Sequence, residues 1–496
     1  MRVGGATPRL RPQPPGLVHR FIPPATLLAA GLVLAACDEG STPPPETRPK
    51  TSRTPPSAVA TPTPVPTPSF VPAPVPTPFV VQVGAGFNEQ IANVNNTLIA
   101  QSGVRWVRAY VNLARNYWVF GPATTNVPPR YPIIGFNTNN LIQDASDVSS
   151  DADVLAIAAL DQLINTKTVA PAGQPMKVIL SLKHDFSYPY PAGTTNFPFN
   201  QFPDLSTPDG ATAVGHMVSA IFNILTTNDR GAGVDIVVTG NEPMFEIQPN
   251  SNPITASNYA KYLNHLVGQL AALRASNNWP YQIYVGALNS PLAPPPAANL
   301  IAPAILGVAS TNTNVAGIDL HEHVASPSEV TADINYVKSQ MTNRTTPWNI
   351  ISTEFSIIRC LETNMTTPMV GTGGNLAQYI NATISNAAAG TPVTPAAFLA
   401  TFQQQPWYPA NWFNQMMSAF QSERVYAVTY GFDEPPRYPW TNNYVRTNVN
   451  NIQPWVLLPV YNATLFGRVT NGPGAGVPVT NPLSAPGFQA AIQNMQ

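Results

Sequence analysis

Apolar runs rich in Val, Ile and Leu alternate with segments of helical periodicity along most of the chain after residue 78. The runs predict eight strands, at residues 79–84, 104–111, 177–182, 234–239, 282–287, 315–320, 348–352 and 426–430. The periodic segments predict helices at 151–166, 211–227, 256–277, 329–342, 375–389 and 411–422. Continuous apolar strands that alternate with helices are typical of a parallel sheet covered by helices.

Eight strand–helix units spread over about 400 residues favour an α/β fold of the closed type, a (β/α)8 TIM barrel with long loop insertions such as 185–208. An open doubly wound sheet is the alternative, but no Gly-rich phosphate loop follows the first predicted strand. The sequence shows no internal repeat. Its Pro/Gly-rich end, after about Gly467, is interpreted as a tail packed on the barrel.

Residues 1–36 have the pattern of a signal peptide. Four arginines and no acidic residue precede an apolar run at 21–36, which is too short and too rich in proline for a comfortable membrane span. The run ends in Leu34-Ala35-Ala36-Cys37, which resembles the bacterial lipobox and implies lipidation of Cys37. The alternative is an ordinary signal peptide with a chance cysteine. We therefore expect a protein anchored by lipid on the extracellular face of a bacterial membrane, or a secreted one.

Residues 37–78 are expected to be a Pro/Thr-rich linker. The segment 43–78 holds 14 of the 56 prolines, a density that excludes helices and sheet ladders and favours extended polyproline II. Simple disorder is the alternative, and a spacer role is compatible with both. The remaining 79–496 are predicted to form one globular domain.

Composition narrows the choice of partners. The segment 79–496 holds 17 basic and 22 acidic residues, a formal net charge of −5, which does not suggest a nucleic-acid partner. Charged residues are scarce while Asn, Thr, Gln, Pro and aromatic residues abound, which suits a neutral, hydroxyl-rich ligand. The second cysteine, Cys360, has no partner for a disulfide if Cys37 is lipidated, and is interpreted as a packed apolar side chain. We expect a monomer without a cofactor.

Polar side chains follow almost every predicted strand. Active sites of (β/α)8 barrels lie at the carboxyl ends of the strands, whereas ordinary strand ends carry turn residues. Seven of the predicted strands run into ionisable, amide or aromatic groups: Arg108-Ala109-Tyr110-Val111-Asn112, Lys183-His184-Asp185, Asn241-Glu242, Asn289, His321-Glu322-His323, Glu354, and Tyr430 with Asp433-Glu434.

Two of these groups, Glu242 and Glu354, fit the carboxyl pair that glycoside hydrolysis needs. The segment VDIVVTGNEP resembles the fourth-strand motif of clan A glycoside hydrolases, and WNIISTEFS resembles their seventh-strand motif. The resemblance implies a retaining enzyme in which Glu242 is the acid/base, Asn241 binds the sugar 2-hydroxyl and Glu354 is the nucleophile. In the predicted strand order these residues close strands four and seven, as the resemblance requires.

Three further segments agree with the same resemblance. GVRWVRAYVN is similar to the second strand of the cellulase and mannanase families, whose arginine, here Arg108, orients the nucleophile. VILSLKHDF places His184 at their third-strand histidine, and GIDLHEHV places His321 at their sixth-strand histidine. The chain departs from the pattern at His323, where a tyrosine is expected, and at Tyr430, where a tryptophan platform is common. Both remain predicted substrate-binding residues.

Simpler interpretations exist for several of these residues. Asn241-Glu242-Pro243 could be a plain turn after a strand, and His184 could be a core histidine. His321 and His323 share one face of a strand and could bind a metal ion, but zinc needs a third protein ligand and no spaced partner motif is visible. Hydrogen bonding to sugar or to a catalytic glutamate is the preferred interpretation, and no metal is expected.

The predicted function is retaining hydrolysis of an extracellular poly- or oligosaccharide by double displacement. Burial and the charge of Glu354 are expected to raise the pKa of Glu242, and Arg108 to lower that of Glu354. The alternatives are a transglycosylase that uses the same residues and a non-catalytic barrel that binds carbohydrate. Carboxyl groups well beyond about 6 Å apart, without Arg108 nearby, would contradict a retaining enzyme.

Overall fold

The computed structural model describes residues 80–87, 103–112, 118–120, 133–136, 153–172, 175–183, 204–246, 256–292, 301–380, 382 and 395–432. The predicted signal peptide, Cys37, the linker, His184 and the predicted tail lie outside these residues. Among the described residues, Cys360 is a buried free cysteine, as the sequence led us to expect.

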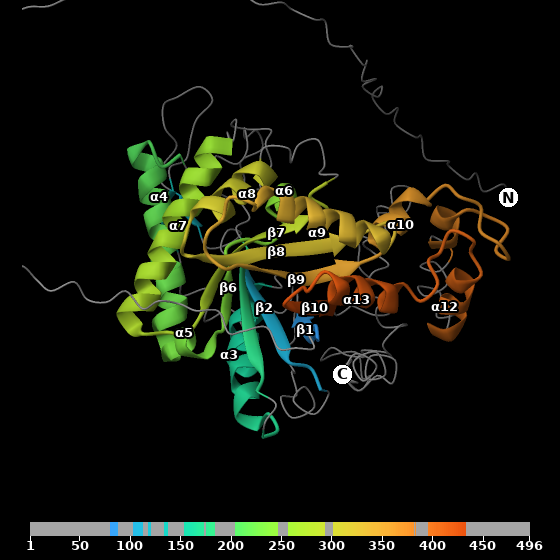
Figure 1. Ribbon diagram of the computed structural model, residues 1–496, viewed down its shortest axis with the longest axis horizontal. Helices are drawn as coiled ribbons and strands as arrows, with labels where there is room; N and C mark the ends of the chain where they lie inside the picture. Colours follow the sequence, from blue (N-terminus) through green and yellow to red (C-terminus); the bar gives the residue numbers. More distant parts are fainter. Residues whose placement is uncertain are drawn as a thin grey trace, which may run out of the picture. The chain divides into compact units, whose positions relative to one another are not determined.

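Eight parallel strands close into a barrel, which confirms the predicted fold class (Figure 1). Each strand pairs with the next along the barrel, and the last pairs with the first. The barrel strands are β1 (Gln82–Phe87), β2 (Trp106–Asn112), β5 (Lys177–Lys183), β6 (Ile236–Val238), β7 (Gln282–Asn289), β8 (Val315–His323), β9 (Asn349–Ser356) and β10 (Ala427–Phe432). All eight correspond to predicted strands, and β7, β8 and β9 continue past the predicted ends into the polar residues.

Helices follow the strands on the outside of the barrel. The longer ones are α3 (Asp153–Val169), α4 (Pro208–Thr226), α7 (Ala256–Asn277), α8 (Ile301–Thr311), α9 (Ser328–Gln340), α12 (Pro395–Gln403) and α13 (Trp412–Ser422). Short turns of helix are η2 (Thr227–Asp229), α5 (Arg230–Gly233), α6 (Pro243–Glu246) and α10 (Ile358–Thr363). Of the predicted helix 375–389, the described part is helical at 376–380.

Several of the described elements were not predicted, among them helix α12, the short helices, helix α8 and the strands β3 and β4. Helix α8 was missed because its sequence, IAPAILGVAST, is apolar on all sides and carries a proline, so it lacks the polar stripe that marks a surface helix. Most of its side chains are buried. The antiparallel pair β3 (Trp118–Phe120) and β4 (Ile133–Phe136) was also missed, because each strand is too short for an apolar period to show.

The barrel interior is apolar at one level and polar at the next. One buried cluster inside the barrel consists of Trp106, Ile179, Ile236, Val238, Tyr284, Ile351 and Ala427. Because side chains alternate along a strand, the next inward positions in β2 and β5 are two residues further on, at Arg108 and Ser181, which are hydrogen bonded to each other. Asp319 and His321 of β8 are buried polar residues at the same end of the barrel. The apolar layer therefore forms the floor on which the polar residues at the carboxyl ends lie.

A bulge in β7 sets the direction of the residues that follow. The pairing of β7 with β8 shifts between Gly286 and Leu288, and Ala287 has a positive φ of 56°. Gly286 itself has a φ of 124°, and a Cβ there would lie 2.5 Å from the Asp319 carbonyl oxygen. The close approach of two backbones and the positive φ both require glycine at this position.

Gly286→Ala is expected to lower the free energy of unfolding by about 1–3 kcal/mol, because alanine is strained at this φ and its Cβ meets backbone. Urea unfolding followed by circular dichroism measures the change. The control is Gly268→Ala in α7, where an added Cβ meets nothing within 4 Å and alanine should stabilise by about 1 kcal/mol. Equal effects of the two substitutions would contradict the strained bulge.

Two buried carboxyl groups meet between the barrel and helix α9. Glu322 alternates with His321 and His323, so its fully buried side chain faces outward toward Asp333. Burial, followed by the Asp333 charge, raises the pKa of Glu322 well above its usual range. Burial, with a smaller contribution from the Glu329 charge, raises the pKa of Asp333 to about 6. The folded protein therefore binds protons at this place that the unfolded chain releases.

Asp333→Asn is expected to stabilise the protein at pH 8 by up to about 3 kcal/mol relative to the wild type, since two pKa units correspond to that free energy. The asparagine carbonyl can still accept the Leu292 N–H, which lies 3.0 Å from Asp333 Oδ1. In the wild type, the stability that protonated Asp333 contributes is present below pH 4 and is lost as the pH rises through 6. The free energies of unfolding of the wild type and of Asp333→Asn, measured between pH 4 and 8, test this prediction. A difference between the two proteins that does not grow with pH would contradict the raised pKa of Asp333.

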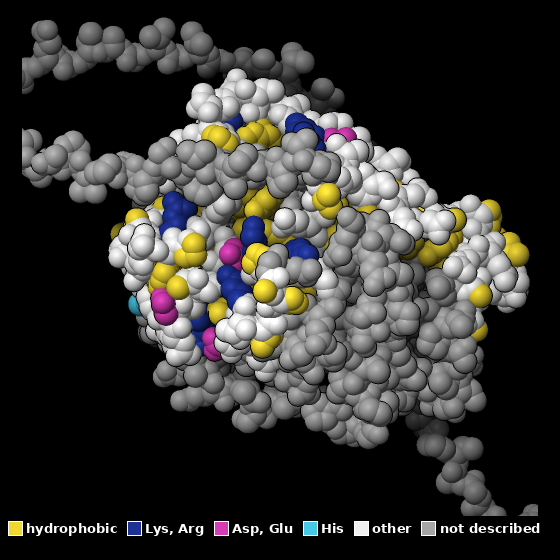
Figure 2. Space-filling view, turned by 60° about the horizontal axis from the view of Figure 1, so that its bottom comes forward, with side chains coloured by type: hydrophobic (Ala, Val, Ile, Leu, Met, Phe, Trp, Pro, Cys, Tyr) yellow, Lys and Arg dark blue, Asp and Glu magenta, His cyan; other side chains and the backbone are white. Residues whose placement is uncertain are grey.

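Charged side chains are dispersed on the face of the molecule shown in Figure 2, where basic and acidic groups of the described residues are interspersed. Within the described ranges, no helix has the length and apolar character that a membrane crossing requires. Lipid anchoring through Cys37 and the monomeric state remain predictions.

Candidate active site

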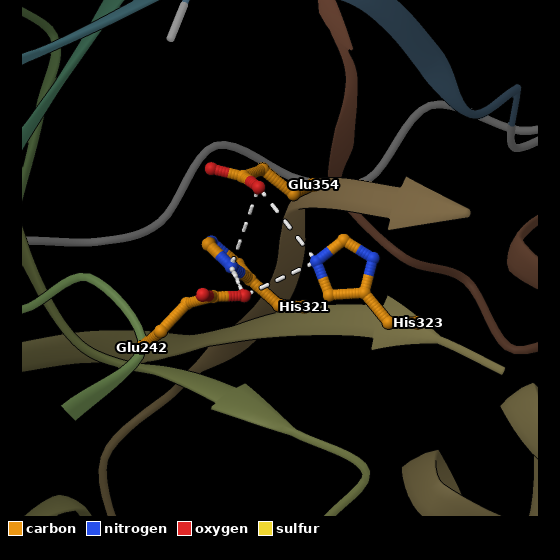
Figure 3. A group of neighbouring side chains, drawn as sticks. All are labelled: Glu242, His321, His323 and Glu354. Carbon is orange, nitrogen blue, oxygen red and sulfur yellow. Dashed lines mark hydrogen bonds and ion pairs between the residues drawn. The ribbon is translucent and has the colours of Figure 1, made fainter. Parts of the chain in front are cut away.

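Four ionisable side chains converge at the carboxyl end of the barrel (Figure 3). Glu242 follows β6, the fourth barrel strand, and Glu354 lies in β9, the seventh. His321 and His323 project from the same side of β8 between them. One ligand atom from each of the four residues can be chosen so that all lie within 4.8 Å of one another. The two glutamates, 112 positions apart in sequence, thus face each other across a few ångströms.

The histidines bridge the two carboxylates. Glu242 Oε1 lies 3.2 Å from His321 Nδ1 and 3.2 Å from His323 Nε2. Glu354 Oε2 lies 3.8 Å and 3.7 Å from the same two nitrogens. The glutamate side chains are partly exposed and the histidines buried, so the carboxylates are the part of this group that solvent reaches.

Arg108 ties three strands together beneath this group. Its buried guanidinium donates from Nη1 to Glu354 Oε1 at 2.5 Å and from Nη2 to Asn241 Oδ1 at 2.5 Å. Its Nε donates to Ser181 Oγ at 2.9 Å. Since each donor has a separate acceptor, the planar guanidinium fixes the orientation of the Glu354 carboxylate.

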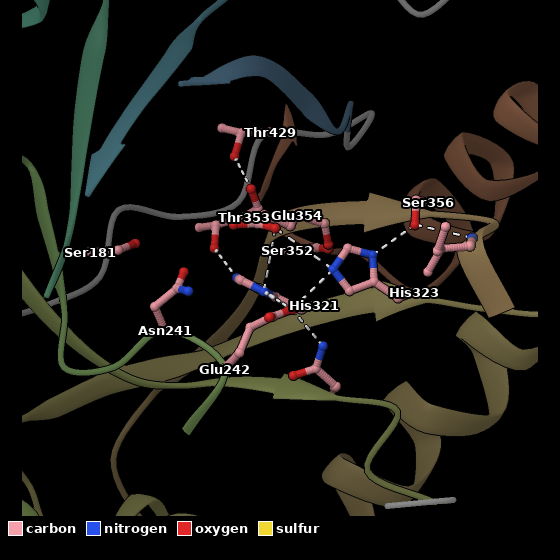
Figure 4. A network of polar contacts seen from close by, with 12 residues as sticks. Ser181, Asn241, Glu242, His321, His323, Ser352, Thr353, Glu354, Ser356 and Thr429 are labelled. Atoms are coloured by element: carbon pink, nitrogen blue, oxygen red, sulfur yellow. Dashed lines mark hydrogen bonds and ion pairs between the residues drawn. The ribbon is translucent and has the colours of Figure 1, made fainter. Parts of the chain in front are cut away.

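Each histidine is also held from behind (Figure 4). His321 Nε2 lies 3.0 Å from Thr353 Oγ1, and the Thr353 hydroxyl donates to Asp319 Oδ2 at 2.5 Å. The Thr353 oxygen is therefore left to accept the proton of Nε2, which leaves Nδ1 of His321 facing the carboxylates. His323 Nδ1 lies 2.8 Å from Ser356 Oγ, which leaves its Nε2 facing them in the same way.

The backbone at Glu242 is in the left-handed region, with a φ of 42°, an uncommon conformation for a residue other than glycine. Pro243 begins helix α6 directly afterwards. Asn289, which follows the β7 bulge, donates to Glu242 Oε1 at 2.7 Å. Strained backbone conformations persist where surrounding contacts hold them and are concentrated at functional sites.

The pKa shifts at the two carboxyls correct one sequence-based expectation. Burial raises the pKa of Glu242, but hydrogen bonds from His321 and His323 outweigh it and hold the pKa well below its usual range. The expected rise is therefore wrong, because it rested on burial and the charge of Glu354 and left out the hydrogen bonds of the two histidines to Glu242. Burial likewise opposes the ionised form of Glu354, and the charges of His321 and Arg108 overcome it, so the pKa is lowered as expected.

His323 carries a proton between the carboxylates. Burial disfavours the charged form of His323, but its hydrogen bonds to Glu242 and Glu354 raise its pKa to about 9. At neutral pH the protein thus holds two glutamate anions with a protonated imidazole in contact with both.

The structure brings most predicted site residues together. Those that meet are Arg108, Asn241, Glu242, His321, His323 and Glu354. Tyr430 does not join them: its side chain faces outward from β10 into an aromatic cluster with Phe355, Trp412 and Phe413 and is buried there. The proposed substrate contact of Tyr430 is therefore not supported, because the alternation of the strand points Thr429, and not Tyr430, inward.

Several supporting residues were not predicted. Asn289 was seen at a strand end but not assigned to the site, and its hydrogen bond to Glu242 depends on the bulge that precedes it. Asp319 lies two residues before His321 and therefore on the same face of β8, a spacing that could have indicated it. Ser181, Thr353 and Ser356 carry no sequence signal that distinguishes them from ordinary strand residues.

No protein-family model and no curated protein sequence matches the chain. Solved structures similar to it include one of two fungal β-1,4-galactanases, at 12% identity over 71% of this chain and 89% of that chain, with a TM-score of 0.35. A Bacillus subtilis mannanase has 11% identity over 71% and 80%, with a TM-score of 0.32. A broad-specificity endoglucanase from Clostridium longisporum has 10% identity over 77% and 96%, with a TM-score of 0.36. Likeness at this level assigns neither a family nor an activity to the chain.

Proposed function

We propose that the protein is a retaining glycoside hydrolase in which Glu354 is the nucleophile and Glu242 the acid/base. The observation that carries the proposal is the opposed pair of carboxylates, with oxygens within 4.8 Å of each other and Arg108 bound to Glu354. Retaining enzymes hold their carboxyl groups about 5–5.5 Å apart, whereas inverting enzymes leave about 6.5–9.5 Å for a water molecule.

In the first step, Glu354 Oε2 attacks the anomeric carbon while the bond from that carbon to the leaving oxygen breaks. Arg108 holds Oε1 and keeps the carboxylate ionised until the attack. Glu242 gives a proton to the leaving oxygen. Because Glu242 is ionised in the free protein, that proton reaches it from His323 Nε2, which lies 3.2 Å from Glu242 Oε1.

In the second step, Glu242 takes a proton from water, and the water oxygen attacks the anomeric carbon and releases Glu354. Two inversions at one carbon return the original configuration. Transfer to a sugar hydroxyl in place of water would make the same site a transglycosylase.

The substrate is proposed to be a neutral poly- or oligosaccharide outside the cell. The scarcity of charged residues and the lipobox-like segment at Cys37 support this choice. Asn241, whose Oδ1 accepts from Arg108, is proposed to contact the hydroxyl next to the anomeric carbon, and His184 is proposed as a further sugar contact.

The test is the stereochemistry of the first product. The full chain is incubated with a panel of glycans in the presence of EDTA, and the anomer released first is identified by proton NMR before mutarotation. We expect the first product to keep the anomeric configuration that the cleaved bond had in the substrate. An inverted first product would overturn the proposed roles, and glycan binding without turnover on any member of the panel would favour the non-catalytic barrel.

A further inference from the structure

We propose that Glu242, His321, His323 and Glu354 also form a binding site for one divalent transition-metal ion, for which Zn²⁺ is the best fit. The sequence supplied only two candidate ligands, the histidines of β8, and no third. The closed barrel supplies a third and a fourth from the ends of β6 and β9.

The nitrogen–oxygen distances between the ligand atoms are close to those of a tetrahedron around zinc, and all four atoms lie within 4.8 Å of one another. Bonds of about 2.0–2.2 Å to imidazole and carboxylate imply ligand atoms roughly 3.3–3.6 Å apart at tetrahedral angles. The four nitrogen–oxygen distances here are 3.2, 3.2, 3.7 and 3.8 Å. Figure 3 shows that the two ring nitrogens and the two carboxylate oxygens face one common point.

The ring nitrogens are already oriented as metal ligands. A histidine that binds zinc donates its other N–H to an oxygen acceptor, which fixes the tautomer and the ring. Asp319 and Thr353 provide such a relay behind His321, with the Thr353 oxygen 3.0 Å from Nε2. Ser356 Oγ lies 2.8 Å behind His323 at Nδ1.

The carboxylates complete the ligand set if the side chains move by a few tenths of an ångström toward the ion. Arg108 binds Glu354 through Oε1, so that Oε2 remains directed at the histidines. Asn289 donates to Glu242 Oε1 and orients that group. Metal binding displaces the proton of His323, since only a neutral imidazole is a ligand. Two carboxylates and two neutral imidazoles then balance the charge of a divalent ion, and this mixed nitrogen and oxygen set suits Zn²⁺ better than Ca²⁺ or Mg²⁺, which prefer oxygen alone.

A bound ion would occupy both proposed catalytic carboxylates. To the extent that the proposed function holds, Zn²⁺ would inhibit glycan cleavage and a chelator would restore it. Binding itself does not depend on that function, so it is measured directly.

The experiment titrates Zn²⁺ into the full chain, freed of metal with EDTA and then of EDTA, by calorimetry near neutral pH. One equivalent is expected to bind with a Kd below about 1 µM. The double variant His321→Gln/His323→Gln is expected to bind at least about 100-fold more weakly. The matched control is His265→Gln, an exposed position of α7, which should bind as the wild type does.

Co²⁺ gives a second measurement on the wild type alone, because four-coordinate Co²⁺ absorbs visible light far more strongly than six-coordinate Co²⁺. If the double variant does not fold, as judged by circular dichroism, Glu242→Gln and Glu354→Gln replace it and should each weaken binding. Failure of the wild type to bind one equivalent, binding unchanged by loss of the ligands, or a six-coordinate spectrum would each overturn the metal site. Absence of glycan cleavage in EDTA would count against the proposed hydrolase and leave the zinc result standing.

Discussion

Glu354→Gln is expected to lower kcat for glycan cleavage by about 10⁴-fold or more, because an amide cannot form the glycosyl–enzyme bond. The substitution preserves the shape of the side chain, and its carbonyl oxygen can still accept from Arg108, so the fold and glycan binding should persist. Steady-state rates on the cleaved glycan, with EDTA present, measure the loss. A KM close to that of the wild type would place the defect in the chemical step.

The control for Glu354→Gln is Glu423→Gln, which makes the same chemical change beside Lys338, at the end of α13. Its rate should equal that of the wild type. If Glu354→Gln kept more than a few per cent of the wild-type rate while Glu423→Gln kept all of it, the nucleophile would have to be another group.

Glu242→Gln is expected to lower kcat on natural glycans by about 10²–10⁴-fold, the usual contribution of a general acid or base. For an aryl glycoside, Glu242→Gln should slow formation of the glycosyl–enzyme less, because a phenolate leaves without a proton. Hydrolysis of the glycosyl–enzyme should then limit the rate, since the variant has no base to activate water. Added azide needs no base and should restore turnover by forming a glycosyl azide of retained configuration.

Azide rescue separates the two glutamates. Glu354→Gln forms no glycosyl–enzyme with retained geometry, so azide should not yield the retained product from it. The reverse outcome, with retained azide product from Glu354→Gln and none from Glu242→Gln, would exchange the two assignments. Circular dichroism of both variants confirms that the comparison is between folded proteins.

The barrel could be predicted because its signals are local. A run of β-branched residues and a helical period extend over a few residues each, and all eight barrel strands were located in this way. Helix α8 was missed for the complementary reason: a helix buried on most sides has no polar stripe to mark its period. The carboxyl ends of the strands could also be located in the sequence. Seven of the predicted strands end in ionisable, amide or aromatic residues, whereas ordinary strand ends carry turn residues.

The site was predicted only in part, because its contacts depend on pleat and register. Tyr430 stands at a strand end like the true site residues, yet its position in the alternation of β10 turns it into the aromatic layer behind the barrel. The β8–β9 register shifts after Leu320, so that His321 pairs with Glu354 and the side chains of both residues enter the site. A register shift of one residue reverses which side chains of a strand face inward, and the sequence carries no local signal of such a shift.

The sequence by itself determined the order of the strands along the chain, the strand ends that carry polar residues, and Glu242 and Glu354 as the candidate catalytic pair. These features follow from residue type and from the local period of apolar positions. Only the tertiary structure decided that two histidines lie between those glutamates. It thereby reversed the expected shift in the pKa of Glu242 and supplied two further metal ligands from distant strands. The physical reason is that hydrogen bonds and charges act over a few ångströms. Closure of the barrel sets distances on that scale between residues that are 79 to 112 positions apart in sequence, as Glu242 is from His321 and from Glu354.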